Sequence, residues 1–559
     1  MVRWRWQPDT VALLLLSLVS LGISLKFAFE LPPLWGSDER AHAGYALEVM
    51  HGHLPRIDTP VVDDPKRYPQ LHDALRGWKT VGRQIWVANH PPLYYLVAAP
   101  FLAVADWLGV PGAGLVAMRV VNGLGTAGSV FLVGLVAREL VPGRRAVSLL
   151  AAALAATAST LSMEGGYGYN DGLAAVAAAG TLLCGIRLLR RGPSRGLLIA
   201  TALTATAAAG LKAPNLIAVA ACTGMAAVAG WRHSTGRRRM LAGLGAAAVA
   251  GGVPALGFGW FYLRNLALYG DLTGANELLG AFQRHAHYTF AGLAGSRGFY
   301  RQLFEEFWIR PHYDPHLRAI PDALFLGAAL GVLLLAVDWL RRRPRQQAVS
   351  GAEPGQRATS GDGPDRPAVA GWRGSWVAWA ALAAHTVLIV VLLIQFRASG
   401  GYISQRYLLP VVPLMATLLA IGLLRLAALV PHPDRARWDA VVALLVSTAM
   451  LVVPFVAYHA SLVSVQRSVK PPGLADPAVG WPGPALALGL AALAAVGFVL
   501  LQARRLVIDP LAGDSVVEAT DSKRAHRPEG DAPVEADGED QLSDDMSSAP
   551  VQVNSGSVE

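Results

Sequence analysis

The chain has only two cysteines among its 559 residues, Cys184 and Cys222, and both fall inside apolar runs. This pair supplies neither a disulfide framework nor a cysteine-based zinc site. Charged residues are also scarce, at 16%, while 53% of the residues are hydrophobic and the mean hydropathy is +0.38. These values exclude an ordinary soluble domain. They are typical of a membrane protein.

The chain also lacks the short motifs that bind nucleotides or activate a serine. It contains no Walker loop, no GxGxxG after a strand and no serine nucleophile elbow. The net charge of +9 does not indicate a nucleic-acid partner, because the basic residues form short clusters between apolar runs, as in RLLRRGPSR and WRHSTGRRR. Neither a nucleotide energy source nor nucleic acid is therefore expected.

Long apolar runs recur along the chain, each near the length of a membrane-spanning helix. We predict an all-α polytopic membrane protein with about twelve transmembrane helices. The first run lacks a following small-x-small cleavage site and is expected to remain as a signal anchor. The predicted spans are 10–29, 113–137, 146–163, 171–189, 196–211, 214–231, 240–260, 320–340, 375–395, 407–428, 438–458 and 482–503.

The basic clusters predict the orientation. All of them fall on one side of the membrane if residues 91–110 do not cross it. The positive-inside rule assigns that side, and both termini, to the cytoplasm. Residues 91–110 are then interfacial or re-entrant.

This topology predicts a transmembrane domain over residues 1–505 with most polar chemistry outside. Residues 30–112 form a first outer loop with juxtamembrane helices, and residues 261–318 form a second outer loop. The loop 341–374 and the acidic tail 506–559 are cytoplasmic, poor in apolar residues and expected to be disordered.

Carboxylates and an imidazole follow the first span in the stretch SDERAHAGYA. On a helix, Asp38 and Glu39 lie four and three residues before His42, so the three side chains share one face. Such a group suits general base catalysis, or a divalent cation with Glu39 and His42 as candidate ligands. The alternative is N-capping by Ser37, with both carboxylates favouring the positive end of the helix dipole.

More polar residues fall at the outer ends of predicted spans. Each has a plainer interpretation as a helix cap, a snorkelling side chain or an interfacial anchor. Together they describe a site for an anionic, lipid-linked substrate and an acid–base reaction. They are His90 in NHPPLYYL, Asn170 and Asp171 in YNDG, Lys212 in GLKAPN, Arg264 and Tyr269 in RNLALYGD, and Arg406 in SQRYLL.

The order of these motifs, over residues 32–413, is similar to that of the GT-C superfamily of integral-membrane glycosyltransferases. That superfamily includes protein O-mannosyltransferases and aminoarabinose transferases, and the chain most resembles a largely uncharacterised bacterial branch. The resemblance implies a polyprenyl-phosphate-linked sugar as donor and a glycan, lipid or protein of the cell envelope as acceptor. It implies an active site at the outer face of a bacterial plasma membrane.

Carried over residue by residue, the resemblance implies that Asp38 is the base and that Glu39 helps to bind the acceptor or a metal. Lys212 and Arg406 would bind the lipid phosphate, with Arg264 as a third candidate. The remaining cavity residues would be His90, Asn170 and Asp171. The approach PPLWGSDE departs from the branch, which often has prolines directly before the acidic pair.

Two other classes of function stay open. A lipid or glycan transporter would use the same basic outer cavity without chemistry, although such proteins commonly show internal repeats, and none is evident in this sequence. A non-catalytic membrane scaffold would keep the fold alone. No cofactor is firmly predicted, and a divalent cation is left open.

Overall fold

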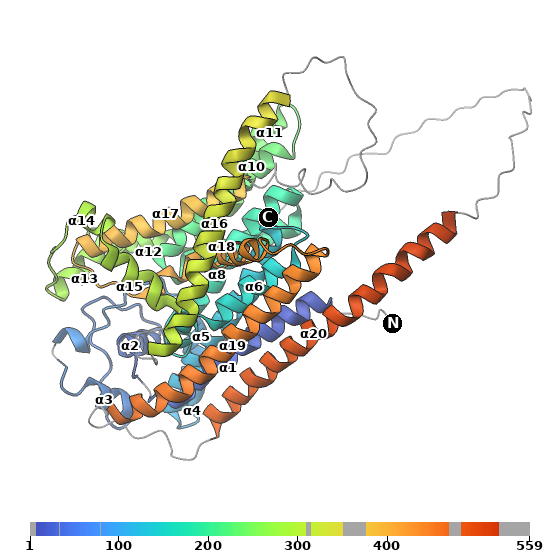
Figure 1. The fold of residues 1–559 in the computed structure, drawn as a ribbon. Helices are drawn as coiled ribbons and strands as arrows, with labels where there is room; N and C mark the ends of the chain where they lie inside the picture. The colour runs from blue at the N-terminus through green and yellow to red at the C-terminus, as the bar shows by residue number, and fades with distance from the viewer. Residues whose placement is uncertain are drawn as a thin grey trace, which may run out of the picture. The chain divides into compact units, whose positions relative to one another are not determined.

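The computed structural model describes residues 7–308 apart from 33 and 79, and residues 315–349, 376–468 and 482–524. In these ranges the regular structure is helical, and the one β-type pairing is an isolated bridge between Pro60 and Gln84 (Figure 1). The all-α prediction is confirmed. The elements are α1 (Pro8–Glu30), α2 (Glu39–Met50), α3 (Pro69–Leu75), η1 (Thr80–Arg83), α4 (Leu93–Trp107), α5 (Pro111–Leu140), α6 (Arg145–Thr157), α7 (Ser159–Gly165), α8 (Asp171–Arg191), α9 (Arg195–Leu211), η2 (Ala213–Asn215), α10 (Leu216–Arg232), α11 (Arg238–Ala247), η3 (Ala248–Gly252), α12 (Val253–Tyr269), α13 (Ala275–Ala281), α14 (Phe290–Ala294), α15 (Arg297–Trp308), α16 (Pro315–Val349), α17 (Trp376–Ala398), η5 (Gln405–Val411), α18 (Val412–Ala427), α19 (Arg435–Ser468) and α20 (Gly483–Arg524).

Internal contacts divide the chain into residues 1–506 and residues 507–559. The helices that carry the candidate site all belong to the first unit. Most of the predicted cytoplasmic loop (350–374) and of the predicted tail (525–559) lies outside the described residues, and α20 continues as far as Arg524.

Nine helices of the described residues are long and apolar enough to cross a membrane, or ten if α6 and α7 count as one bent span. The described residues therefore do not confirm the expected number of twelve. One of the two remaining predicted spans falls on α9, which has only 17 residues. The other falls on α16, whose side chains the structure describes only in part.

The predicted span 146–163 is two helices that meet at 57°. The break is at Ala158, whose backbone is extended, with φ −65° and ψ 113°. The Thr157 hydroxyl, one residue earlier, donates to the carbonyls of Ala153 and Leu154. Threonine hydroxyls that bond back along a helix in this way favour a bend. The bend directs α7 and the turn after it toward the candidate site.

A second difference concerns the predicted span 240–260, because its helix continues nine residues further, to Tyr269. The helix stops at Gly270, whose φ of 76° lies in the left-handed region. Glycine adopts this conformation without the steric cost that a Cβ atom brings. Residues that the sequence placed in the second outer loop therefore belong to the last turns of α12.

Long helices join two kinds of polar cluster at their opposite ends. In α5, Arg119 lies near the first end and Glu139 near the last, which at 1.5 Å per residue separates them by about 30 Å. Asp171 and Arg190 are separated by about 28 Å along α8. These distances are close to the thickness of the hydrocarbon core of a bilayer, about 30 Å. The carboxylate-rich ends and the arginine-rich ends thus lie one membrane thickness apart.

At the arginine-rich ends, three acidic residues each hold two or three arginines. All but one of these ion pairs join different helices, and they use most of the arginine clusters that predicted the cytoplasmic side. The groups are Asp9 with Arg145 and Arg505, Glu139 with Arg187, Arg190 and Arg191, and Asp439 with Arg144 and Arg435.

The first and last helices of this unit approach each other through small residues. A Cβ atom on Gly22 of α1 would lie only 2.6 Å from the carbonyl oxygen of Ala487 and 2.8 Å from the Cβ of Ala491 in α20. Only glycine allows this approach. Small residues of this kind let helix backbones pack closely within a membrane.

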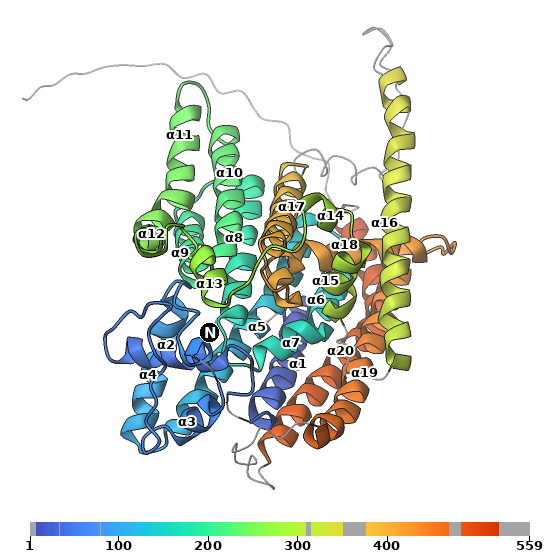
Figure 2. The same ribbon diagram turned by 90° about the vertical axis from the view of Figure 1, so that its left-hand side faces the viewer.

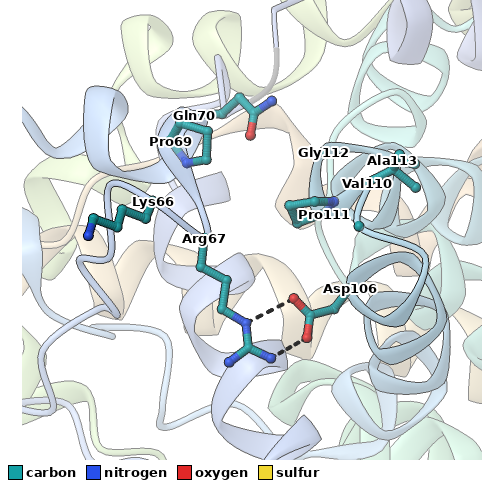
Figure 3. Close-up of a pocket in the computed structure, with 10 residues that line it drawn as sticks. Lys66, Arg67, Pro69, Gln70, Asp106, Val110, Pro111, Gly112 and Ala113 are labelled. Carbon is teal, nitrogen blue, oxygen red and sulfur yellow. Dashed lines mark hydrogen bonds and ion pairs between the residues drawn. The ribbon is translucent and has the colours of Figure 1, made fainter.

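The first outer loop contributes α2, α3, η1 and α4, and these helices gather at one end of the bundle (Figure 2). α4 has 15 residues, which corresponds to about 22 Å, too short to cross the hydrocarbon core. This length agrees with the interfacial or re-entrant segment predicted for residues 91–110. Arg67 and Asp106 form an ion pair that ties the loop to the end of α4, beside a cavity of about 620 Å³ (Figure 3).

Candidate active site

The candidate site forms where four interruptions of the helical structure meet. They are the start of α2, the turn 166–170 between α7 and α8, the break between α9 and η2, and η5 before α18. At the third break Lys212 is extended, with φ −160° and ψ 136°, and Pro214 follows it. Proline lacks the N–H group that a continuing helix needs, so the chain turns here and Lys212 leaves the helical path.

Arg406 of η5 is the centre of the cluster. Its guanidinium forms an ion pair with Asp38, and its Nη1 atom lies 3.8 Å from Asp171 and 3.9 Å from Glu164. The Arg406 side chain is 14% exposed. A single, partly buried arginine thus faces carboxylates from three different segments of the chain.

Lys212 holds the other side of Asp171, and the two side chains form a buried ion pair. Its Nζ also lies 5.7 Å from the centre of the Tyr407 ring. The cluster therefore contains two cations, Lys212 and Arg406, against three carboxylates. An anionic ligand that reaches either cation has to displace a carboxylate from it.

Asp38 combines a strong partner with some access to solvent. It precedes the first residue of α2, its backbone N–H donates to the Tyr169 hydroxyl at 3.3 Å, and its side chain is 22% exposed. Burial acts to raise the pKa of Asp38, but the charge and hydrogen bond of Arg406 outweigh burial and hold this pKa below its ordinary value. The carboxylate is ionised and, while Arg406 remains paired with it, a weak base.

Two histidines lie next to this group, the buried His42 and the partly buried His90. The His42 and His90 rings are 5.7 Å apart, and His42 Nδ1 makes a hydrogen-bond contact of 2.9 Å with the Tyr95 hydroxyl. His90 Nδ1 lies 3.3 Å from the amide nitrogen of Asn170, which donates to the Leu211 carbonyl at 2.8 Å. Burial, as the largest cause, lowers the pKa of His42 to about 3 and that of His90 well below its ordinary value, so both rings are neutral.

Glu39 lies next to Asp38 in sequence but points into a different environment. Both of its oxygens accept from Arg119 of α5, at 2.6 and 2.8 Å, and both side chains are less than 5% exposed. The same carboxylate accepts from the backbone N–H groups of Gly36 and Gly168. Arg119 in turn donates to the carbonyls of Ala28, Leu31 and Pro32. Glu39 is thus a fully hydrogen-bonded anchor between the first span, α2 and the turn before α8.

Arg264 and Tyr269 lie apart from the carboxylate cluster. The Arg264 guanidinium donates to the carbonyls of Leu54 and Pro55, and the Tyr269 hydroxyl accepts from the backbone N–H of Ile57. Both side chains therefore hold the first outer loop against the end of α12. In this structure the contacts of Arg264 and Tyr269 are structural ones between α12 and the first outer loop.

The side chains around the site do not fit a metal ion. Among the residues that the structure describes, no three His, Cys, Asp or Glu side chains come together as ligands. The two candidate ligands are engaged elsewhere, Glu39 by Arg119 and His42 by Tyr95.

Several residues of the site escaped the sequence analysis as candidates. Arg119 lies inside an apolar run, and an arginine in a membrane span is itself a signal of a functional or structural role. Tyr169 and Tyr407 each stack near Arg406, with ring centres 4.9 and 5.7 Å from its guanidinium carbon. Both tyrosines adjoin a predicted residue in the sequence, Asn170 and Arg406 respectively. This adjacency was the only feature of the sequence that indicated Tyr169 and Tyr407.

No protein-family model and no curated protein matches this sequence. Among solved structures, the chain is similar to ArnT from Cupriavidus metallidurans bound to undecaprenyl phosphate, with 14% identity over 89% of this chain and 78% of that one and a TM-score of 0.39. The same protein in the apo state gives a TM-score of 0.40 over the same shares, also at 14% identity. The oligosaccharyltransferase of Archaeoglobus fulgidus in complex with Zn and sulfate is 14% identical over 80% of this chain and 53% of that one, with a TM-score of 0.41. Both proteins belong to the GT-C superfamily, which the sequence motifs resemble.

Proposed function

We propose that this protein is a membrane glycosyltransferase that moves a sugar from a polyprenyl-phosphate donor to an acceptor of the cell envelope. The reaction takes place at the outer face of a bacterial plasma membrane, with Asp38 as the base. The observation that carries the proposal is the contact of Asp38 with Arg406 in a cluster that also contains Lys212. A base and two phosphate-binding cations are the groups that this transfer needs.

The position of the cluster fits a donor that remains in the membrane. An apolar groove of about 420 Å³ lies between α17 and α10, the helix that starts at Leu216, shortly after Lys212. The groove begins at Ile217, five residues after Lys212, which is roughly 8 Å further along the chain at the rise of a helix. It extends to Val228 of α10 and Val377 of α17, near the contact between Arg232 and Trp376. An isoprenoid chain in this groove would bring its phosphate up to Lys212.

The ion pairs of the cluster suggest an order of events. A phosphate that binds Arg406 competes with Asp38 for the guanidinium. Loss of this partner removes the main influence that lowers the pKa of Asp38, so the carboxylate becomes a stronger base. The donor would thus activate the base when it binds, and Asp38 would stay weakly basic without it.

In the reaction, an acceptor hydroxyl gives its proton to Asp38 as its oxygen attacks the anomeric carbon of the donor sugar. The bond between this carbon and the phosphate oxygen breaks, and its electron pair stays on the polyprenyl phosphate. Lys212 and Arg406 stabilise the charge that develops on this leaving group. Glu39 acts as a positioning residue, because its oxygens are held by Arg119 and it starts the helix that follows Asp38.

The test uses the full-length protein in liposomes with a radiolabelled polyprenyl-phosphate sugar. Asp38→Asn is expected to reduce sugar transfer by about 10²- to 10⁴-fold, the usual contribution of a general base. The matched control is Asp106→Asn, which removes a carboxylate paired with Arg67 outside the site and should leave transfer unchanged. Full activity of Asp38→Asn would exclude Asp38 as the base. Donor flipping without product would indicate a transporter, and neither flipping nor product would indicate a scaffold.

A further inference from the structure

Arg40 is a buried cation that the proposed reaction leaves unused. It follows Asp38 and Glu39 on α2 and is only 6% exposed. Its guanidinium carbon lies 3.8 Å from the centre of the Trp78 ring and 5.8 Å from that of Trp86. No hydrogen bond or ion pair links the Arg40 side chain to another described residue, and its Nε atom is buried without a partner.

The two carboxylates nearest to Arg40 in the sequence are engaged by other arginines. Asp38 pairs with Arg406, and Glu39 accepts both hydrogen bonds of the Arg119 fork. Arginine keeps its charge in proteins, so Arg40 cannot relieve its burial by losing a proton. A buried charge without a partner is costly. The stacked indole compensates for only part of this cost.

This arrangement leaves the right atoms free for a ligand. A guanidinium stacked on a ring still presents N–H donors along its edge, and these match the two oxygens of a carboxylate or phosphate. Trp78 itself is 51% exposed, so the stack lies beside a route from the outside. Arg40 is the second residue of α2, two positions after the proposed base Asp38.

We propose that Arg40, stacked on Trp78, forms a second anion subsite beside Asp38, which binds a carboxylate or phosphate group of the acceptor. The subsite is distinct from the donor side, where Arg406 and Lys212 lie against Tyr169 and Tyr407. That the bound molecule is the acceptor rests on the proposed glycosyltransferase function. The anion preference itself rests on the contacts of Arg40 alone. An acidic glycan or a phosphorylated lipid would carry the required group.

The experiment measures binding, by isothermal titration calorimetry, of three short amphiphiles to the purified full-length protein in nanodiscs. Hexyl glucuronide carries a carboxylate, hexyl phosphate carries a phosphate, and hexyl glucoside is the neutral reference. We expect at least one anionic probe to bind about tenfold more tightly than the glucoside. The stronger of the two anionic probes identifies carboxylate or phosphate as the natural group.

Arg40→Gln should abolish this preference, and Arg40→Lys should keep part of it, because lysine retains the charge without the planar fork. The matched control is Arg67→Gln, which removes an arginine that pairs with Asp106 away from the site. No anion preference in the wild-type protein, or an unchanged preference in Arg40→Gln, would overturn the proposal. If Arg40→Gln does not fold, Arg40→Lys and Trp78→Leu replace it, and full preference in both would overturn the proposal equally.

The two proposals fail separately. If no donor supports sugar transfer while the anion preference still depends on Arg40, the subsite stands and the glycosyltransferase function falls. If transfer occurs and Arg40→Gln keeps the preference, the function stands and the subsite falls.

Discussion

Replacement of Glu39 by glutamine separates a structural role of this residue from a chemical one. Glu39 accepts four hydrogen bonds, two from Arg119 at 2.6 and 2.8 Å and one each from Gly36 and Gly168 at 3.1 and 2.7 Å. In Glu39→Gln, the new amide group faces two of these N–H donors instead of accepting from them. The Arg119 charge also loses its only described carboxylate partner.

The expected cost follows from the burial of the pair. Removal of one partner from a buried ion pair typically costs about 3–5 kcal/mol, because the other charge remains in a low-dielectric environment. Both side chains are almost inaccessible, so the upper part of this range applies. Unfolding in mixed SDS micelles measures this free energy. The control Asp106→Asn breaks the more exposed Arg67 pair and should cost about 1 kcal/mol or less.

A double-mutant cycle with Arg119→Met tests the pairing itself. The double variant leaves no buried charge, so its free energy of unfolding should fall by less than the sum of the two single effects, with a coupling of about 1–3 kcal/mol. The reasoning would be refuted if Glu39→Gln unfolded within about 0.5 kcal/mol of the wild type. If Glu39→Gln were as stable as the wild type but had lost sugar transfer, Glu39 would act in the chemistry, and the structural role assigned to it would be wrong.

Three further predictions concern the site. Lys212→Gln should weaken the binding of polyprenyl phosphate, measured by calorimetry, by about tenfold, while Lys212→Arg should keep most of the affinity. Equal affinities of Lys212→Gln and the wild type would exclude Lys212 as a phosphate ligand. Arg406→Gln should raise the pKa of Asp38 and move the acid limb of the pH–rate profile to higher pH, whereas an unmoved limb would mean that Arg406 does not control Asp38. Burial lowers the pKa of His42 to about 3, so between about pH 3 and pH 6.5 the folded state binds fewer protons than the unfolded state. The contribution of the neutral His42 ring to the stability of the folded state is therefore complete above about pH 6.5 and decreases as the pH falls toward 3. When the pH falls from 7.5 to 5, the free energy of unfolding should decrease by about 2 kcal/mol because of this residue, and His42→Phe should abolish this part of the decrease. An identical pH dependence of unfolding in the variant would contradict the buried neutral ring.

The sequence predicted the ends of helices better than the directions of side chains. Apolar runs and arginine clusters indicated which residues lie at the same end of the bundle, and the structure brings Asp38, Asp171, Lys212 and Arg406 into contact. These four come from segments separated by up to 368 positions. Hydropathy carries no information on rotation around a helix axis. Arg264 illustrates this limit, because it lies at the expected end of its span but turns toward the first outer loop.

Pairings between distant residues were also beyond the sequence. Glu39 and Arg119 are 80 positions apart, and nothing local to either residue indicates the other. As a result, two adjacent carboxylates that looked equivalent in the sequence have different environments. Asp38 faces the cluster with some access to solvent, while Glu39 is enclosed. The spacing rule that placed both on one face describes the helix and not what surrounds it.

The pairing of Asp9 with Arg505 also has a consequence for how the protein is made. The two residues are 496 positions apart, and the close approach of Gly22 to Ala487 joins the same two helices. At a synthesis rate of about 5–20 residues per second, α1 waits for roughly 25–100 s in the membrane before this partner exists. During that time Arg145, at 3.4 Å, is the other partner of Asp9 among the described residues, and the face of α1 around Gly22 is open to lipid or to assisting proteins. Biogenesis of this protein therefore includes a late step in which the last helix closes over the first.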